Sequence, residues 1–179
     1  IITIGPFAGL LCILAGLSTV LIDLMEIRTS SFGYYFAIIM MANLLASIVA
    51  GKLANLLDSF KIISTGAIIC FLSGITAYVL ALSESINPLS IVMPAAGFMV
   101  GFPLVVYAAT AEAMSPFGLI AGKASSMIGL IQLGCGAVTS LILGSVSNET
   151  QFPLVIALSL SGTLTIIPLW AIYKLKSKV

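Results

Sequence analysis

The sequence contains no histidine, and only 7% of its 179 residues are charged. The absence of histidine excludes imidazole catalysis, metal sites built on histidine and pH switches that use its titration. The shortage of charge excludes a water-soluble domain, in which about a quarter of the residues are charged. Hydrophobic residues make up 60% of the chain, and the mean hydropathy is +1.25. We therefore expect most of the exterior of this protein to face lipid.

The sequence also lacks the features of nucleic-acid-binding proteins, metal sites and enzymes. Seven basic residues are too few to neutralise a run of nucleic-acid phosphates, so we expect no nucleic-acid partner. The three cysteines, Cys12, Cys70 and Cys135, form no CxxC pair and each lies in an apolar run, which predicts small buried hydrophobic residues. No HExxH, GxSxG or Walker motif is present. The sequence therefore predicts no enzyme, no metal and no cofactor.

The few charged residues divide the chain into six uncharged, apolar runs. Each run is long enough for a helix of about 20 residues, which crosses a hydrocarbon core of about 30 Å. The strands of a membrane β-barrel would instead alternate apolar and polar residues, and the run from Leu10 to Leu17 shows no such alternation. We predict an all-α membrane protein, a single six-helix bundle over residues 1–179. Its predicted spans are residues 1–22, 32–51, 62–82, 89–111, 124–146 and 152–173.

The basic residues predict how the bundle is oriented. With the lysine-rich tail in the cytoplasm, six of the seven basic residues lie on that side and only Arg28 lies on the other. We therefore expect a multi-pass protein of the cytoplasmic (inner) membrane with both termini in the cytoplasm. The first span is apolar from residue 1 and has no initiator Met, so we read the start as a cut inside a longer polypeptide.

Small and polar residues recur at helical spacing. The fifth span carries a continuous stripe of them: Gly122, Ser125, Gly129, Gln132, Gly136 and Ser140. The fourth span carries Gly97 and Gly101. Small residues let membrane helices approach closely. We predict helix-packing roles for Gly97, Gly101, Gly129 and Gly136.

Asn43 and Gln132 are the most polar side chains within the spans. An unpaired amide in hydrocarbon costs several kcal/mol, so both should face the bundle or a wet cavity. Two interpretations stay open: each amide binds a substrate, or each bonds to a neighbouring helix. Tyr107 lies deep enough to line a cavity, and Ser125 lies on the polar stripe. We take Asn43, Tyr107, Gln132 and Ser125 as candidate substrate-binding residues.

No carboxylate lies at the centre of a predicted span. Asp23 and Glu112 are at the ends of spans, where they are expected to be solvated. If transport is coupled to protons, we expect the coupling acid to lie elsewhere.

The order of these features resembles the carboxy-terminal half of a major facilitator superfamily transporter, of the Bcr/CflA drug:proton antiporter type. The most specific segments are Ala113-Met114-Ser115-Pro116-Phe117 and Ala121-Gly122-Lys123-Ala124-Ser125-Ser126, followed by Gly129, Gln132 and Gly136-Ala137. A weaker similarity covers Ser30-Ser31-Phe32-Gly33 with Phe36-Ala37. The resemblance implies that the six spans correspond to helices 7 to 12, and that the first, second, fourth and fifth border a central cavity.

The resemblance also implies a function. Two six-helix halves would rock around a midplane site, so this half needs the missing amino-terminal six-helix half or a second copy. The expected activity is multidrug efflux by proton antiport, with drug resistance as its result and a small amphiphilic substrate and a proton as partners.

The sequence departs from the family in two places. Asn55 stands where the superfamily's loop motif has an acid, and Leu56 stands where it has an arginine. Lys123 replaces a small residue. These departures leave an alternative open: a truncated or degenerate membrane remnant without transport activity. A channel is a third alternative, although no charged ring or filter sequence is visible.

Overall fold

The computed structural model describes residues 2–83, 87–146 and 150–176, with side chains for all of these except Leu119 and residues 170–176. The first residue of the first predicted span and the tail residue Lys178 therefore lie outside the described residues. Within the described residues, six helices are long and apolar enough to cross a membrane, and no strand is present. The prediction of an all-α membrane protein with six spans is confirmed.

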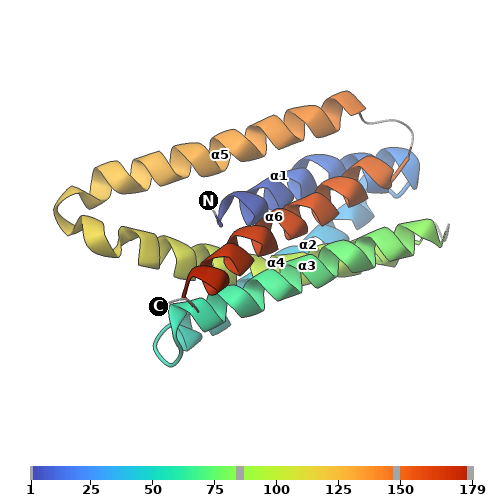
Figure 1. The fold of residues 1–179 in the computed structure, drawn as a ribbon. Coiled ribbons are helices and arrows are strands. Elements are labelled where there is room, and N and C mark those ends of the chain that lie inside the picture. Colours follow the sequence, from blue (N-terminus) through green and yellow to red (C-terminus); the bar gives the residue numbers. More distant parts are fainter. Residues whose placement is uncertain (1, 84–86, 147–149, 177–179) are drawn as a thin grey trace.

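The helices follow one another with short connections (Figure 1). A π-helical segment, η1, continues the first helix, and a 3-10 segment, η2, joins the fourth to the fifth. The elements are α1 (Ile4–Ser18), η1 (Thr19–Leu24), α2 (Thr29–Leu53), α3 (Ser59–Leu82), α4 (Pro88–Met114), η2 (Ser115–Ile120), α5 (Ala121–Val146) and α6 (Phe152–Lys176).

Several helices extend a few residues past the predicted spans. Lys52, Lys61, Glu112 and Lys123 all lie inside helices, although they bound the uncharged runs of the sequence. An uncharged run measures the part of a helix that hydrocarbon surrounds, whereas helical backbone continues into the interface, where a charged side chain is solvated. The ends of the apolar runs and the ends of the helices therefore differ.

Local sequence explains how α4 begins and why it tolerates proline. The side chain of Asn87 accepts a hydrogen bond of 3.1 Å from the backbone N–H of Leu89, and Pro88 occupies the first turn. Two further prolines, Pro94 and Pro103, lie inside the helix. Proline within a membrane helix is tolerated because neighbouring helices can satisfy the freed backbone groups.

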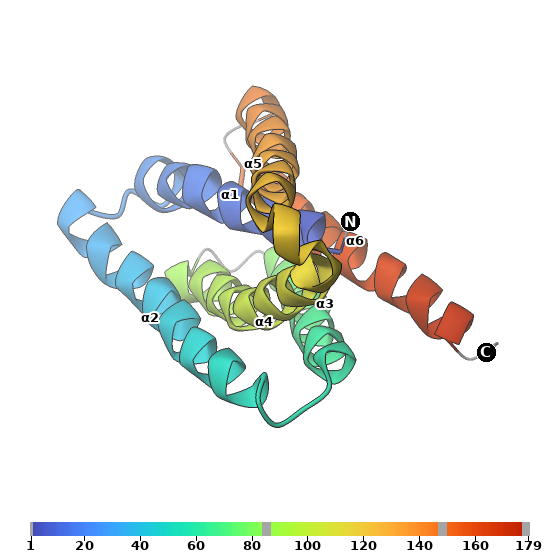
Figure 2. The same cartoon turned by 90° about the vertical axis from the view of Figure 1, so that its left-hand side faces the viewer.

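Helix α3 packs between α4 and α6, while α1 contacts both α5 and α6, and α2 packs against α4. Figure 2 shows α2 and α5 as outlying helices of the bundle, on either side of α1 and α4. This position leaves both of them with little cover. Only 17% of the apolar window of each is buried, compared with 67% for α4.

The contact between α3 and α4 depends on two glycines. A Cβ atom on Gly101 would lie 2.6 Å from the carbonyl oxygen of Gly66, and a Cβ atom on Gly66 would lie 2.9 Å from the carbonyl oxygen of Gly101. Because each glycine is opposed by the other's backbone, neither site can accept a side chain without moving a helix. Cys70 is fully buried at the same contact, as is Cys12 elsewhere in the core, which confirms the prediction for these two cysteines.

Candidate functional site

Asn43 lies between α2 and α4. Its Nδ2 donates a hydrogen bond of 3.3 Å to the carbonyl oxygen of Met99 on α4 and lies 3.6 Å from the sulfur of the same residue. The side chain is half-buried. One turn further along α2, the hydroxyl of Ser47 donates to the carbonyl oxygen of Asn43, at 2.8 Å. In this structure the Asn43 amide therefore joins two helices.

Gln132 lies on α5 and is 7% exposed. It lies one turn before Gly136, whose missing side chain leaves room for Leu11 of α1, so this face of α5 lies against α1. The Nε2 of Gln132 is buried and donates no hydrogen bond among the described residues. A buried donor without an acceptor costs about 1–3 kcal/mol, so a hydrogen-bond acceptor that reached this amide would recover that free energy.

Tyr107 is 51% exposed on α4. It lies nine residues, or two and a half helical turns, after Phe98, which packs beneath Gly9 of α1. Tyr107 and Phe98 therefore lie on opposite sides of α4, and the phenol points away from α1. Tyr107 shares its exposed side with Met93, two heptads earlier in the chain and 63% exposed.

Ser125 is exposed near the start of α5. Its hydroxyl donates to the carbonyl oxygen of Gly122 in its own helix, at 3.1 Å. This bond satisfies the hydroxyl locally and does not connect Ser125 to another helix.

The four candidate substrate-binding residues thus occupy separate places. Asn43 joins α2 to α4, Gln132 faces α1, Tyr107 lies on the side of α4 away from α1, and Ser125 is exposed near the start of α5. The chain by itself does not bring them into one pocket. A common site would need another surface placed against this bundle.

The candidate packing residues also differ among themselves. A Cβ atom on Gly97 would lie 2.6 Å from the hydroxyl oxygen of Ser73, and Gly101 is opposed by Gly66 of the same helix, α3. Gly136 lies against Leu11. Gly129, in contrast, has no other atom within 4 Å of the place where its side chain would be.

Thr110 was not singled out in the sequence. Its Oγ1 is buried and has no hydrogen-bond partner among the described residues, the same condition as the amide nitrogen of Gln132. The reasoning applied to Asn43 and Gln132 extends to any hydroxyl in an apolar helix, although threonine can usually satisfy itself on the preceding turn. The structure shows that the Thr110 hydroxyl makes no such bond.

The described residues contain no group of three or more His, Cys, Asp or Glu side chains that could hold a metal ion.

Comparison with known proteins finds a relative. The chain is 26% identical over 174 residues to the bicyclomycin resistance protein homolog of Haemophilus influenzae, and the aligned region covers 96% of this chain. The match covers 42% of that protein, so this chain spans less than half of the relative's length. No family model and no solved structure matches the chain. The resemblance predicted from the sequence is therefore confirmed: the chain is similar to a transporter of the Bcr/CflA type, and its six helices match half of a major facilitator superfamily fold.

Proposed function

We propose that this chain is the carboxy-terminal half of a secondary multidrug exporter that works by alternating access. The observation that carries the proposal is a similarity over nearly the whole chain to a protein named for resistance to a drug. Six apolar helices without a water-soluble domain among the described residues support the same conclusion, because any activity must then take place within the bilayer or at its faces.

The exporter is complete when a second six-helix bundle covers the exposed sides of α2 and α5. These two helices are the least buried of the spans, with 17% of the apolar window buried in each. The second bundle is the amino-terminal half of the transporter or a second copy of this chain. The candidate site residues lie apart in one half, which is the arrangement expected when a binding site forms between two halves.

Within that site, Gln132 donates a hydrogen bond to the substrate. Its Nε2 is buried, has no acceptor among the described residues and can donate a hydrogen bond to a substrate. An amphiphilic drug with one acceptor group in an apolar body satisfies this amide. The counter-transported ion is a proton, and the acid that carries it lies outside the spans of this chain, since no carboxylate lies at their centre.

The exporter resides in the cytoplasmic membrane with both termini inside. The support for this orientation is the accumulation of lysine on one side of the predicted spans.

To test the proposal, the complete polypeptide that carries this chain is expressed in a drug-sensitive bacterium, and its susceptibility to bicyclomycin and ethidium is measured. The same protein in proteoliposomes should move ethidium when a pH gradient is imposed. Full membrane abundance with neither resistance nor gradient-driven movement would instead favour the inactive remnant.

The substitution Gln132→Leu tests the role of the amide. We expect it to change the ratio of resistance between the two drugs by about tenfold, because a site that pairs a substrate acceptor discriminates by unpaired polar groups. The matched control is Leu133→Ala, a change at a neighbouring side chain that is 58% exposed, which should leave the ratio unchanged. If Gln132→Leu lowers only the abundance of the protein, the residue serves packing.

A further inference from the structure

A cavity lies within this six-helix bundle, at the end where α1 and α3 begin and α4 ends. Its volume is about 660 Å³, which is in the range of small-molecule pockets. Helices α1, α3, α4, α5 and α6 all contribute to its walls. Neither Asn43 nor Gln132 lines it.

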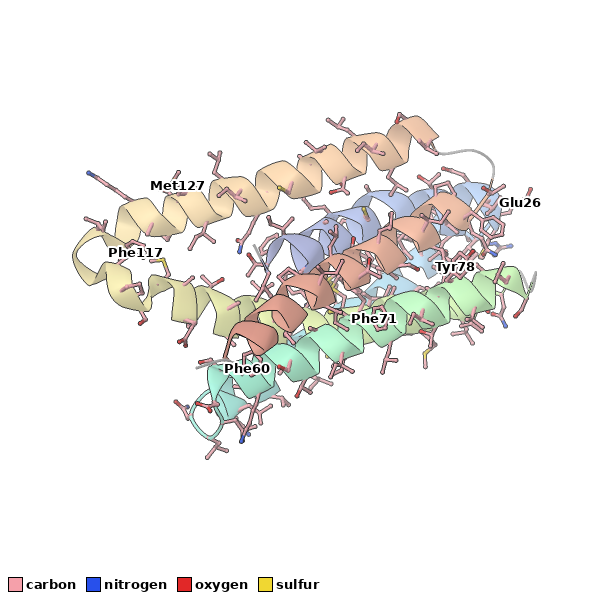
Figure 3. The ribbon with its side chains drawn as sticks, in the orientation of Figure 1. Glu26, Phe60, Phe71, Tyr78, Phe117 and Met127 are labelled. Carbon is pink, nitrogen blue, oxygen red and sulfur yellow. The ribbon has the colours of Figure 1, made fainter. Side chains whose placement is uncertain are left out.

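The path of the chain between α4 and α5 creates this cavity. Helix α4 passes through η2 before α5 turns back, so the first half of α5 stands away from the other helices (Figure 1). Gly122 and Gly129 on that part of α5 have no other atom within 4 Å of their Cβ positions. In Figure 3, Phe60 marks the start of α3 on one side of this end, and Phe117 marks the turn into α5 on the other.

The walls are mainly apolar and include Ile63 of α3, Ile128 and Ile131 of α5, and Pro168 of α6. Four polar side chains interrupt them: Thr3, Ser59, Thr110 and Glu112. The Oγ1 of Thr110 is buried and makes no hydrogen bond with the described residues. Glu112, two residues closer to the end of α4, is exposed and forms no ion pair within the described part of the chain. Among the residues found to line the cavity, Glu112 is the sole charged one.

We propose that this cavity binds a small lipophilic cation, with its apolar body between Ile63, Ile128 and Ile131 and its charge near Glu112. The single negative charge favours a cation and opposes an anion of equal size, because their interactions with one carboxylate have opposite signs. The unpaired hydroxyl of Thr110 adds a hydrogen-bonding position for cations that carry a polar group. This inference goes beyond the proposed function, because the site belongs to one half and needs no second bundle.

Cysteine protection tests the proposal at the site itself. In the complete protein with Cys135→Ser, the variant Ile128→Cys places a thiol on the cavity wall, and its rate of maleimide labelling is measured in membranes. We expect tetraphenylphosphonium to slow labelling by about tenfold at saturation, because an occupied pocket excludes the reagent. Tetraphenylborate, an anion of nearly the same shape, should not slow it.

Two matched variants make the result specific. Leu130→Cys lies on the same helix but is 73% exposed and does not line the cavity, so its labelling should ignore both ions. Glu112→Gln should raise the tetraphenylphosphonium concentration needed for protection by about tenfold, while labelling without the ion stays unchanged.

Three results would overturn the proposal: equal protection at Leu130→Cys, equal protection by tetraphenylborate, or protection that Glu112→Gln does not weaken. The exporter hypothesis is judged separately, by resistance and by Gln132→Leu. Protection at Ile128→Cys without drug resistance would support the cation site and count against the exporter.

Discussion

Helices α3 and α5 both carry glycines at helical spacing, yet the structure uses them differently. On α3, a Cβ atom on Gly66 would lie 2.9 Å from the Gly101 carbonyl oxygen, and one on Gly74 would lie 2.9 Å from the Cα of Ser159. On α5, Gly122 and Gly129 have nothing within 4 Å. A stripe of small residues therefore allows a second helix to approach closely, but it forms a packing contact only where such a helix is present.

The same contrast divides the whole bundle. Helices α3 and α4 form a closely packed unit with α6, whereas α2 and α5 expose large apolar side chains over most of their length. In the proposed exporter, the packed unit moves as a rigid body and the exposed helices meet the other half. Substitutions should therefore affect stability strongly in the first region and weakly in the second.

The largest effect should come from Phe98→Ala on α4. Phe98 is fully buried and its ring lies beneath Gly9, so truncation leaves a cavity that the helices cannot fill. We expect the free energy of unfolding to fall by about 3 kcal/mol. Unfolding in mixed micelles titrated with sodium dodecyl sulfate measures the change. Leu130→Ala, at a side chain of α5 that is 73% exposed, should change it by less than about 0.5 kcal/mol. Similar losses for both variants would remove the distinction between the two regions.

An intermediate effect is expected from a single added methyl group. Gly101→Ala places a Cβ 2.6 Å from the backbone oxygen of Gly66, so a helix must shift, at a cost of about 1–3 kcal/mol. Gly129→Ala meets no atom within 4 Å and should stabilise the protein by up to about 1 kcal/mol through helix propensity. Unfolding of the two variants under the same conditions provides the comparison. A loss of stability in Gly129→Ala would show that α5 has a close partner that this chain does not supply.

The smallest effect should come from Asn43→Leu, at the contact between the packed unit and an exposed helix. The substitution removes the 3.3 Å hydrogen bond to Met99, and interhelical bonds of this kind contribute about 0.6 kcal/mol in membranes. Ser47→Ala removes only a bond within α2 and should have no measurable effect on unfolding. A loss above about 2 kcal/mol for Asn43→Leu would mean that the amide does more than join α2 to α4.

The sequence was sufficient to predict the resemblance to a transporter half. It also predicted that the Gln132 amide avoids lipid, and the structure shows this side chain to be buried. The site was less predictable. Helical spacing places Gln132 and Ser125 on one stripe, but only the angle at which α5 leaves the bundle decides that Gln132 is covered and Ser125 is exposed. The surroundings of Tyr107 were equally unpredictable, because the position of a residue along α4 does not indicate which side of the helix another helix covers.

The sequence alone determined that the chain crosses the bilayer six times, because each charged residue in hydrocarbon is costly and the thirteen in this chain leave six uncharged runs between them. Tertiary structure decided which small residues touch another helix, which polar atoms stay unpaired and where a cavity opens. Those outcomes depend on the rotation and tilt of each helix against its neighbours. Hydropathy does not predict them, because lipid is as apolar as leucine and an apolar side chain can therefore face either lipid or another helix.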